Sequence, residues 1–162
     1  MLLKTFGVIL LLSGSLYLCF CFTQFERRRL RQCEGLLLLL RHIKAQISCF
    51  HMPLGRIYAT FSSEELERCG FLEALRQTED ISKALDSAKG EMWLSGEEMT
   101  LLRSFSGEVG TSYVEEQIAC CDYYIGQLEQ AYAERKNALP ARRKLYRSLF
   151  ITGGLMLVII LL

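Results

Sequence analysis

The sequence predicts an all-α protein: a membrane-anchored antiparallel bundle of about five to six helices, flanked by N- and C-terminal transmembrane helices. Three observations predict this. Uncharged apolar runs stand near both ends of the 162-residue chain, each beside a cluster of basic residues. Between them, apolar residues recur at helical spacing, and the whole chain has only two prolines. We divide the chain into a first anchor, a basic collar, a helical bundle, a second collar and a second anchor, at residues 1–22, 23–33, 34–140, 141–148 and 149–162.

The first anchor contains an uncharged stretch at residues 5–22. Eighteen helical residues span roughly 27 Å, close to the hydrocarbon thickness of a bilayer. A cleaved signal peptide is the alternative. We favour a retained anchor because the run is long, no small-x-small site follows it, and the positive charge comes after the run.

The second anchor, residues 149–162, is uncharged but only 14 residues long, so by length alone it could be a buried core helix. We expect it to span a membrane because basic residues that can reach headgroups come directly before it. Both collars lie on the bundle side of their anchors. The positive-inside rule therefore predicts a two-pass protein of the cell membrane with its soluble domain in the cytoplasm.

The collars predict contact with anionic membrane lipid, worth about 1 kcal/mol per basic residue. Their residues are Arg27, Arg28, Arg29, Arg31, Arg142, Arg143, Lys144 and Arg147. Inside the anchors, small residues allow helices to approach closely. We therefore predict a contact between the two transmembrane helices at Gly14, Gly153 and Gly154. The alternative is that glycine is simply tolerated in such helices.

Two heptad-like seams predict the centre of the bundle. One consists of Leu36, Leu40, Ile43, Ile47 and Phe50, and the other of Val114, Ile118, Cys121, Ile125, Leu128 and Tyr132. Since their spacing matches, we expect the two helices to pack antiparallel. Capping boxes at 62–65, 95–98 and 112–115 predict three helix starts. Pro140 should kink or break the last helix.

The charge distribution predicts a surface for a partner. Residues 32–134 contain 8 basic and 17 acidic side chains, a net charge of −9, whereas the whole chain has a net charge of +1. An overall basic field is absent, so we expect no nucleic-acid partner. We predict that Glu64, Glu65 and Glu67 form a docking face for a basic cytosolic protein, with an ordinary solvated face as the alternative.

Residues suited to catalysis or to cofactor binding are few. His42 and His51 have no third ligand at metal spacing, so we predict no metal site, no cofactor and no catalytic residue. Seven cysteines without a C-x-x-C pair are typical of reduced thiols in the cytosol. We therefore favour a non-enzymatic platform or adaptor subunit. Two alternatives stay open: a small membrane-bound enzyme using Cys49 or the glutamates at 64–67, and a purely structural anchored protein.

Several segments have a familiar order and spacing. They are RRRLRQ (Arg27 to Gln32), MPL (Met52 to Leu54), LLRSFSGEVGTS (Leu101 to Ser112), Gln117-Ile118, and KLYRSLFITGGLMLVIILL (Lys144 to Leu162). With these segments the chain resembles stage III sporulation protein AB of endospore-forming bacteria over essentially its full length. It departs from that pattern in its many cysteines and in Pro140.

The resemblance implies a place and partners. That family belongs to a secretion-like channel complex between mother cell and forespore, and its soluble domain is similar to the F-type platform protein of type II secretion. By resemblance, the chain would lie on the mother-cell side of the outer forespore membrane. It would couple a cytosolic ATPase, stage III sporulation protein AA, to other membrane proteins of the complex. Homo-oligomerisation stays open.

Overall fold

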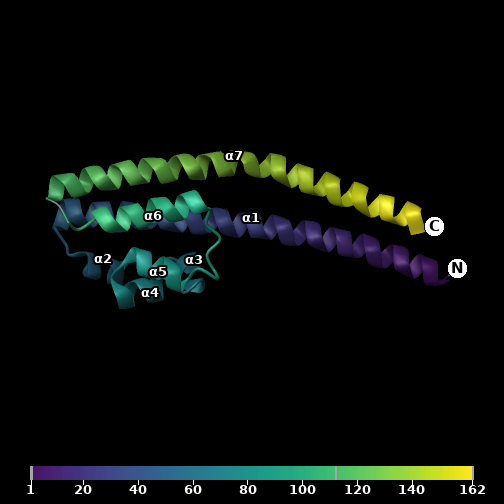
Figure 1. The fold of residues 1–162 in the computed structure, drawn as a ribbon, viewed down its shortest axis with the longest axis horizontal. Helices are drawn as coiled ribbons and strands as arrows, with labels where there is room; N and C mark the ends of the chain where they lie inside the picture. The colour runs from purple at the N-terminus through teal and green to yellow at the C-terminus, as the bar shows by residue number, and fades with distance from the viewer. Residues whose placement is uncertain (1, 112, 162) are drawn as a thin grey trace. The chain divides into compact units, whose positions relative to one another are not determined.

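The computed structural model describes the backbone of residues 2–111 and 113–161, and the side chains of residues 13–14, 17–111, 113–154, 156 and 159. The described residues form helices and no strands, so the all-α prediction is confirmed. The helices are α1 (Leu2–Phe50), α2 (Leu54–Thr60), α3 (Glu64–Arg68), α4 (Phe71–Thr78), α5 (Ile81–Ser87), α6 (Gly96–Glu108) and α7 (Val114–Leu161) (Figure 1).

The chain divides into two compact units. Unit 1 consists of Met1–Arg27 with Arg135–Leu162, and unit 2 consists of Arg28–Glu134. The first boundary falls inside the predicted collar at 23–33. The second boundary lies between Glu134 and Arg135, before the predicted collar at 141–148. The division of the chain into anchors, collars and bundle stays a prediction.

Within unit 2, α1 and α7 pack antiparallel, as the two seams predicted. Arg41 Nη2 of α1 lies 2.6 Å from Glu129 Oε1 of α7, and Lys44 of α1 forms an ion pair with Asp122 of α7. The residue numbers increase along α1 while those of their partners decrease along α7, so the two helices run in opposite directions. The seam side chains are buried or packed against the core. Phe50 is the exception, at 67% exposed. It is the last residue of α1, and His51 turns the chain away with φ 50°.

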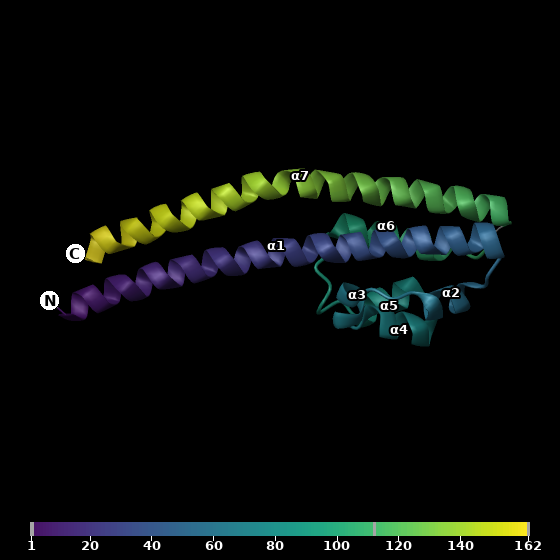
Figure 2. The ribbon, with the colours of Figure 1, turned by 180° about the vertical axis from the view of Figure 1, so that it is seen from behind.

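The short helices complete the core of unit 2. In both views, α2, α3, α4 and α5 gather along the second half of α1 on the side away from α7, and α6 lies along another face of α1 (Figures 1 and 2). Three large side chains at the centre are almost completely buried: Tyr58 from α2, Phe71 from α4 and Phe105 from α6. Gly70 separates α3 from α4 because it takes the left-handed φ of 74°, which glycine adopts without strain.

The capping boxes had three outcomes. The box at Ser95 is confirmed: Glu98 N donates to Ser95 Oγ at 3.2 Å, and Ser95 N donates to Glu98 Oε2 at 2.7 Å. The box at 62–65 is wrong, because α3 begins one residue later, after Ser63, and Ser63 makes no side-chain cap. The third box begins at residue 112, which lies outside the described residues.

The predicted break at Pro140 does not occur, since α7 continues from Val114 to Leu161. A proline inside a helix removes one backbone donor and crowds the preceding turn, which costs about 3 kcal/mol. The helix tolerates this cost without ending.

Asp80 caps α5 and ties it to α6. Its Oδ1 accepts hydrogen bonds from Ser82 N at 2.8 Å, from Lys83 N at 3.4 Å and from Ser106 Oγ at 3.0 Å. Partial burial alone would raise the pKa of the Asp80 carboxyl, but these hydrogen bonds and the charge of Lys83 outweigh it and lower the pKa.

We expect Asp80→Ala to lower the free energy of unfolding by about 1 kcal/mol at pH 7, as loss of an N-cap usually does. Folding lowers the pKa of the Asp80 carboxyl below its unfolded-state pKa of about 3.9. The stabilisation by the charged carboxylate is therefore fully present above about pH 3.9, and it is lost as the pH falls through the folded-state pKa. Denaturation of the detergent-solubilised chain at pH 7 and pH 2.5 measures this. The gap between wild type and variant should narrow at pH 2.5, and an equal gap at both values would contradict the role of the charge.

Candidate partner-binding surface and basic collars

The three predicted docking glutamates lie on α3, and each is paired with an arginine. Arg68 pairs with Glu64 at 2.5 Å within α3, and Arg76 Nη2 of α4 lies 3.3 Å from Glu67 Oε1. Glu65 is only 18% exposed in its side chain, and Arg31 Nε of α1 lies 3.3 Å from its Oε1. This surface of α3 therefore has mixed charge. Its use as a docking face stays a prediction.

Two arginines of the first collar make contacts within unit 2. Arg31 neutralises Glu65, and Arg29 Nε donates a 2.8 Å hydrogen bond to the carbonyl oxygen of Trp93. Arg28 is exposed. These collar residues therefore hold α3 and the α5–α6 loop against the start of the unit, which the charge pattern alone did not reveal.

In unit 1, the two helical segments pack antiparallel and meet through aromatic rings. The ring centroid of Phe22 lies 5.5 Å from that of Tyr146 and 5.7 Å from that of Phe150. One turn further along α1, Arg142 Nη1 lies 3.5 Å from Glu26 Oε1. Glu26 is the single acidic residue of this unit, against eight basic residues, and it is only 7% exposed. Glu26 was not among the predicted site residues, although an acidic residue beside an arginine cluster is visible in the sequence.

The Glu26–Arg142 pair predicts a charge-reversal effect. Arg142→Glu would leave the buried Glu26 carboxylate beside a second carboxylate, so we expect a loss of about 1–3 kcal/mol in the free energy of unfolding, discounted because Arg142 is half exposed. Arg143→Glu is the matched control, because Arg143 is exposed and the charge change is identical. Thermal unfolding in detergent compares the two. The double variant Glu26→Arg/Arg142→Glu should recover most of the loss; no recovery would exclude a direct pair.

The three glycines of the predicted contact between the anchors have different surroundings. A Cβ built at Gly14 or Gly153 would meet no described atom within 4 Å, whereas Gly154 is buried. Many side chains around these glycines lie outside the described residues. The contact between the two anchors therefore stays a prediction.

Among the described residues, no helix combines the length and the apolar character that crossing a membrane requires. The predicted anchors at 1–22 and 149–162 contain most of the side chains that lie outside the described residues. The two transmembrane helices and the cell-membrane location stay predictions.

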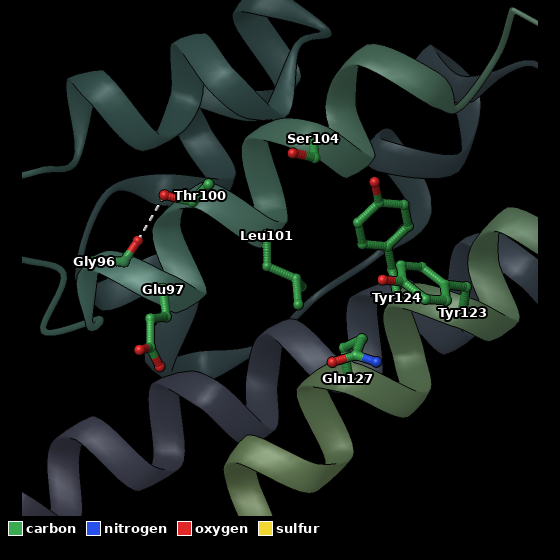
Figure 3. Close-up of a pocket in the computed structure, with 8 residues that line it drawn as sticks. All are labelled: Gly96, Glu97, Thr100, Leu101, Ser104, Tyr123, Tyr124 and Gln127. Atoms are coloured by element: carbon green, nitrogen blue, oxygen red, sulfur yellow. Dashed lines mark hydrogen bonds between the residues drawn. The ribbon is translucent and has the colours of Figure 1, made fainter.

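A groove lies between α6 and α7 in unit 2. Its volume is about 470 Å³, and its lining residues are Gly96, Glu97, Thr100, Leu101, Ser104, Tyr123, Tyr124 and Gln127. In Figure 3, Leu101 projects from α6 toward α7, opposite the two tyrosines. Tyr123 is 61% exposed, so a large aromatic ring is available at the rim. Glu97 is the one charged residue of this lining.

Glu108 fixes one end of the α6–α7 contact. Tyr124 Oη donates a 2.9 Å hydrogen bond to Glu108 Oε1, and Cys120 Sγ lies 3.7 Å from Glu108 Oε2. Burial, together with the Glu108 carboxylate, raises the pKa of Tyr124 to about 12 and that of Cys120 to about 11. Burial also raises the pKa of Cys121 to about 12. These thiols stay protonated at neutral pH, which suits packing and disfavours nucleophilic chemistry.

Cys49, one of the residues of the enzyme alternative, is exposed near the end of α1. In the described part of the chain, no hydrogen bond joins it to His51. The described side chains also bring together no group of three metal-ligating residues. The predicted absence of catalysis, cofactor and metal stays a prediction.

The sequence pattern of one protein family, described as stage III sporulation protein AB, matches residues 4–162. The chain belongs to the stage III sporulation protein AB family. The match covers essentially all of both units, so the resemblance seen in the sequence is confirmed and a role related to sporulation is supported. Among curated proteins and solved structures, none gives a significant match to this member of the stage III sporulation protein AB family.

Proposed function

We propose that this chain is a non-enzymatic platform subunit of a sporulation channel complex between mother cell and forespore. In this proposal, unit 1 crosses the membrane twice and unit 2 lies in the mother-cell cytoplasm. Unit 2 docks a cytosolic ATPase, stage III sporulation protein AA, while unit 1 contacts membrane partners and lipid. Family membership supports the link with sporulation.

The observation that carries the membrane part is the exposure of large apolar side chains in unit 1. Residues on both of its helical segments are 43–71% exposed: Tyr17, Leu18, Phe20, Phe22, Leu145, Leu149, Ile151, Met156 and Ile159. An apolar surface of this extent is unfavourable in water and favourable in lipid. The basic residues at 142–144 and 147 directly precede the apolar part of the second segment, as headgroup contacts require.

The α6–α7 groove is the docking surface that we favour. The exposed ring of Tyr123 lies at its rim, and Leu101 lines its wall. Glu97 is the one charged residue of the lining. Unit 2 contains 11 basic and 17 acidic residues, a net charge of −6. The fitting occupant is therefore a segment of the ATPase that carries a large apolar side chain flanked by lysine or arginine. The α3 glutamates fit less well because arginines of unit 2 already pair with them.

Co-purification of the ATPase with the full-length, detergent-solubilised chain tests the docking. Tyr123→Arg/Glu97→Lys should lower the amount retained at least tenfold, because it places two positive charges against a basic partner. Glu64→Lys/Glu67→Lys is the matched control and should have a small effect. If Glu64→Lys/Glu67→Lys lowers retention and Tyr123→Arg/Glu97→Lys does not, the docking face is on α3 and not in the groove. Undiminished retention with both variants would exclude both faces.

A further inference from the structure

The α5–α6 loop is fixed to the start of unit 2 by three hydrogen bonds. Gln32 is only 4% exposed, and its side-chain amide bonds the loop twice. Gln32 Nε2 donates to the carbonyl oxygen of Glu91 at 2.9 Å, and Trp93 N donates to Gln32 Oε1 at 2.8 Å. Arg29 Nε donates to the carbonyl oxygen of Trp93 at 2.8 Å. A loop tied in this way has a defined position.

The same loop leaves a large aromatic side chain partly in solvent. Met92 is buried at 5% exposure, yet its neighbour Trp93 is 39% exposed. Trp93 is the only tryptophan in the chain. At this exposure, part of its ring is in contact with solvent, at the surface of unit 2.

The surroundings of Trp93 carry the charge that anionic headgroups attract. Arg28 lines the small cavity beside it, and Lys89 is exposed four residues earlier in the loop. Arg68 also lines this cavity, together with Glu65 and Glu91. Arg68 pairs with Glu64 and Arg31 pairs with Glu65. Arg28 and Lys89 are the exposed basic side chains beside Glu91.

The residue that holds the loop is close in sequence to the predicted first anchor. Arg29, which bonds the carbonyl oxygen of Trp93, follows Phe22 by seven residues in the sequence. Phe22 is the last residue of the uncharged run. Tryptophan prefers the headgroup level because its ring is apolar and its N–H is polar.

We propose that Trp93 and the basic residues around it form a lipid-binding surface of unit 2 that contacts the anionic headgroups of a bilayer. Gln32 and Arg29 are positioning residues: they hold the loop so that the Trp93 ring lies among the headgroups. The surface would fix the tilt of unit 2 on the membrane, which sets where a docked partner is held. This inference rests on the membrane location proposed above for unit 1.

Intrinsic fluorescence of the full-length chain in liposomes tests the surface, because Trp93 is the sole tryptophan. The liposomes contain phosphatidylcholine with about one-third phosphatidylglycerol, and a nitroxide is attached either to a headgroup or to an acyl chain. We expect the headgroup nitroxide to quench Trp93 at least twofold and more strongly than the acyl-chain nitroxide. Gln32→Ala should reduce this quenching because it releases the loop.

A matched control places the reporter elsewhere on unit 2. In Trp93→Phe/Tyr113→Trp, the tryptophan stands just before α7, at a position that is 84% exposed. Because α1 and α7 pack antiparallel within unit 2, the start of α7 lies near the end of α1 and not near Arg28. Neither nitroxide should quench it. Equal quenching at both positions, or no quenching of Trp93 in chains that float with the liposomes, would overturn the surface. Chains that do not float would instead overturn the membrane location.

Discussion

Phe105→Ala should lower the free energy of unfolding by about 3–5 kcal/mol. The Phe105 side chain is fully buried, and its ring meets that of Tyr124 edge-on, with the centroids 5.5 Å apart. The truncation removes one of the contacts between α6 and α7 and leaves a cavity in the core of unit 2. Chemical denaturation of the detergent-solubilised chain, followed by Trp93 fluorescence, measures the loss.

Leu38→Ala is the control for this prediction. Leu38 lies on α1 among buried leucines but is itself 50% exposed, so its truncation should cost less than about 1 kcal/mol. A similar loss for the two variants would mean that Phe105 is not at the centre of the core. It would also remove the basis for a preformed α6–α7 groove.

Met156→Arg should prevent the second anchor from crossing the membrane. A charged residue near the middle of a membrane helix costs about 2.5–3.5 kcal/mol on insertion scales, and this run has only 14 residues to offset it. Met156 is 69% exposed in unit 1, so no protein core shields the new charge. Alkaline phosphatase fused to the C-terminus reports the crossing, because it is active only outside the cytoplasm.

The wild-type fusion should be active, and Met156→Leu should match it because it keeps the residue apolar and of similar size. Met156→Arg should lose most of the activity at an unchanged protein level. An inactive wild-type fusion would contradict the two-pass topology. An active Met156→Arg fusion would contradict this prediction, because the second anchor would then cross the membrane even with a charged residue near its middle.

The seam helices were predictable because their pattern is local and periodic. The spacing of Leu36, Leu40, Ile43 and Ile47 defines one face of a helix, and the matching spacing in α7 predicts its partner, so the antiparallel packing of α1 on α7 was correct. The end of the apolar pattern did not coincide with the end of the buried face. Phe50 fits the spacing but is exposed, because a helix ends where the backbone turns and not where the apolar period stops.

The candidate site depended on contacts between residues far apart in the chain, which no local pattern gives. Glu64 and Glu67 read as bare negative charge, yet Glu67 pairs with Arg76 of the next helix, and the neighbouring Glu65 with Arg31 of α1. Gln32 gave no signal at all, although its amide fixes a loop about sixty residues away in sequence. Tyr123 stands off the seam of α7, and this is the signal that could have indicated its exposure.

Cys49 is the residue that reports most directly on which side of the membrane unit 2 lies. It is exposed on unit 2, whereas Cys69 and Cys121 are at most 8% exposed and burial raises their pKa. A membrane-impermeant maleimide is applied to intact sporulating cells and to permeabilised cells, and Cys49→Ser supplies the background. If unit 2 is cytoplasmic, labelling that depends on Cys49 appears only after permeabilisation. Full labelling of Cys49 in intact cells would contradict the topology and the proposed contact with a cytosolic ATPase.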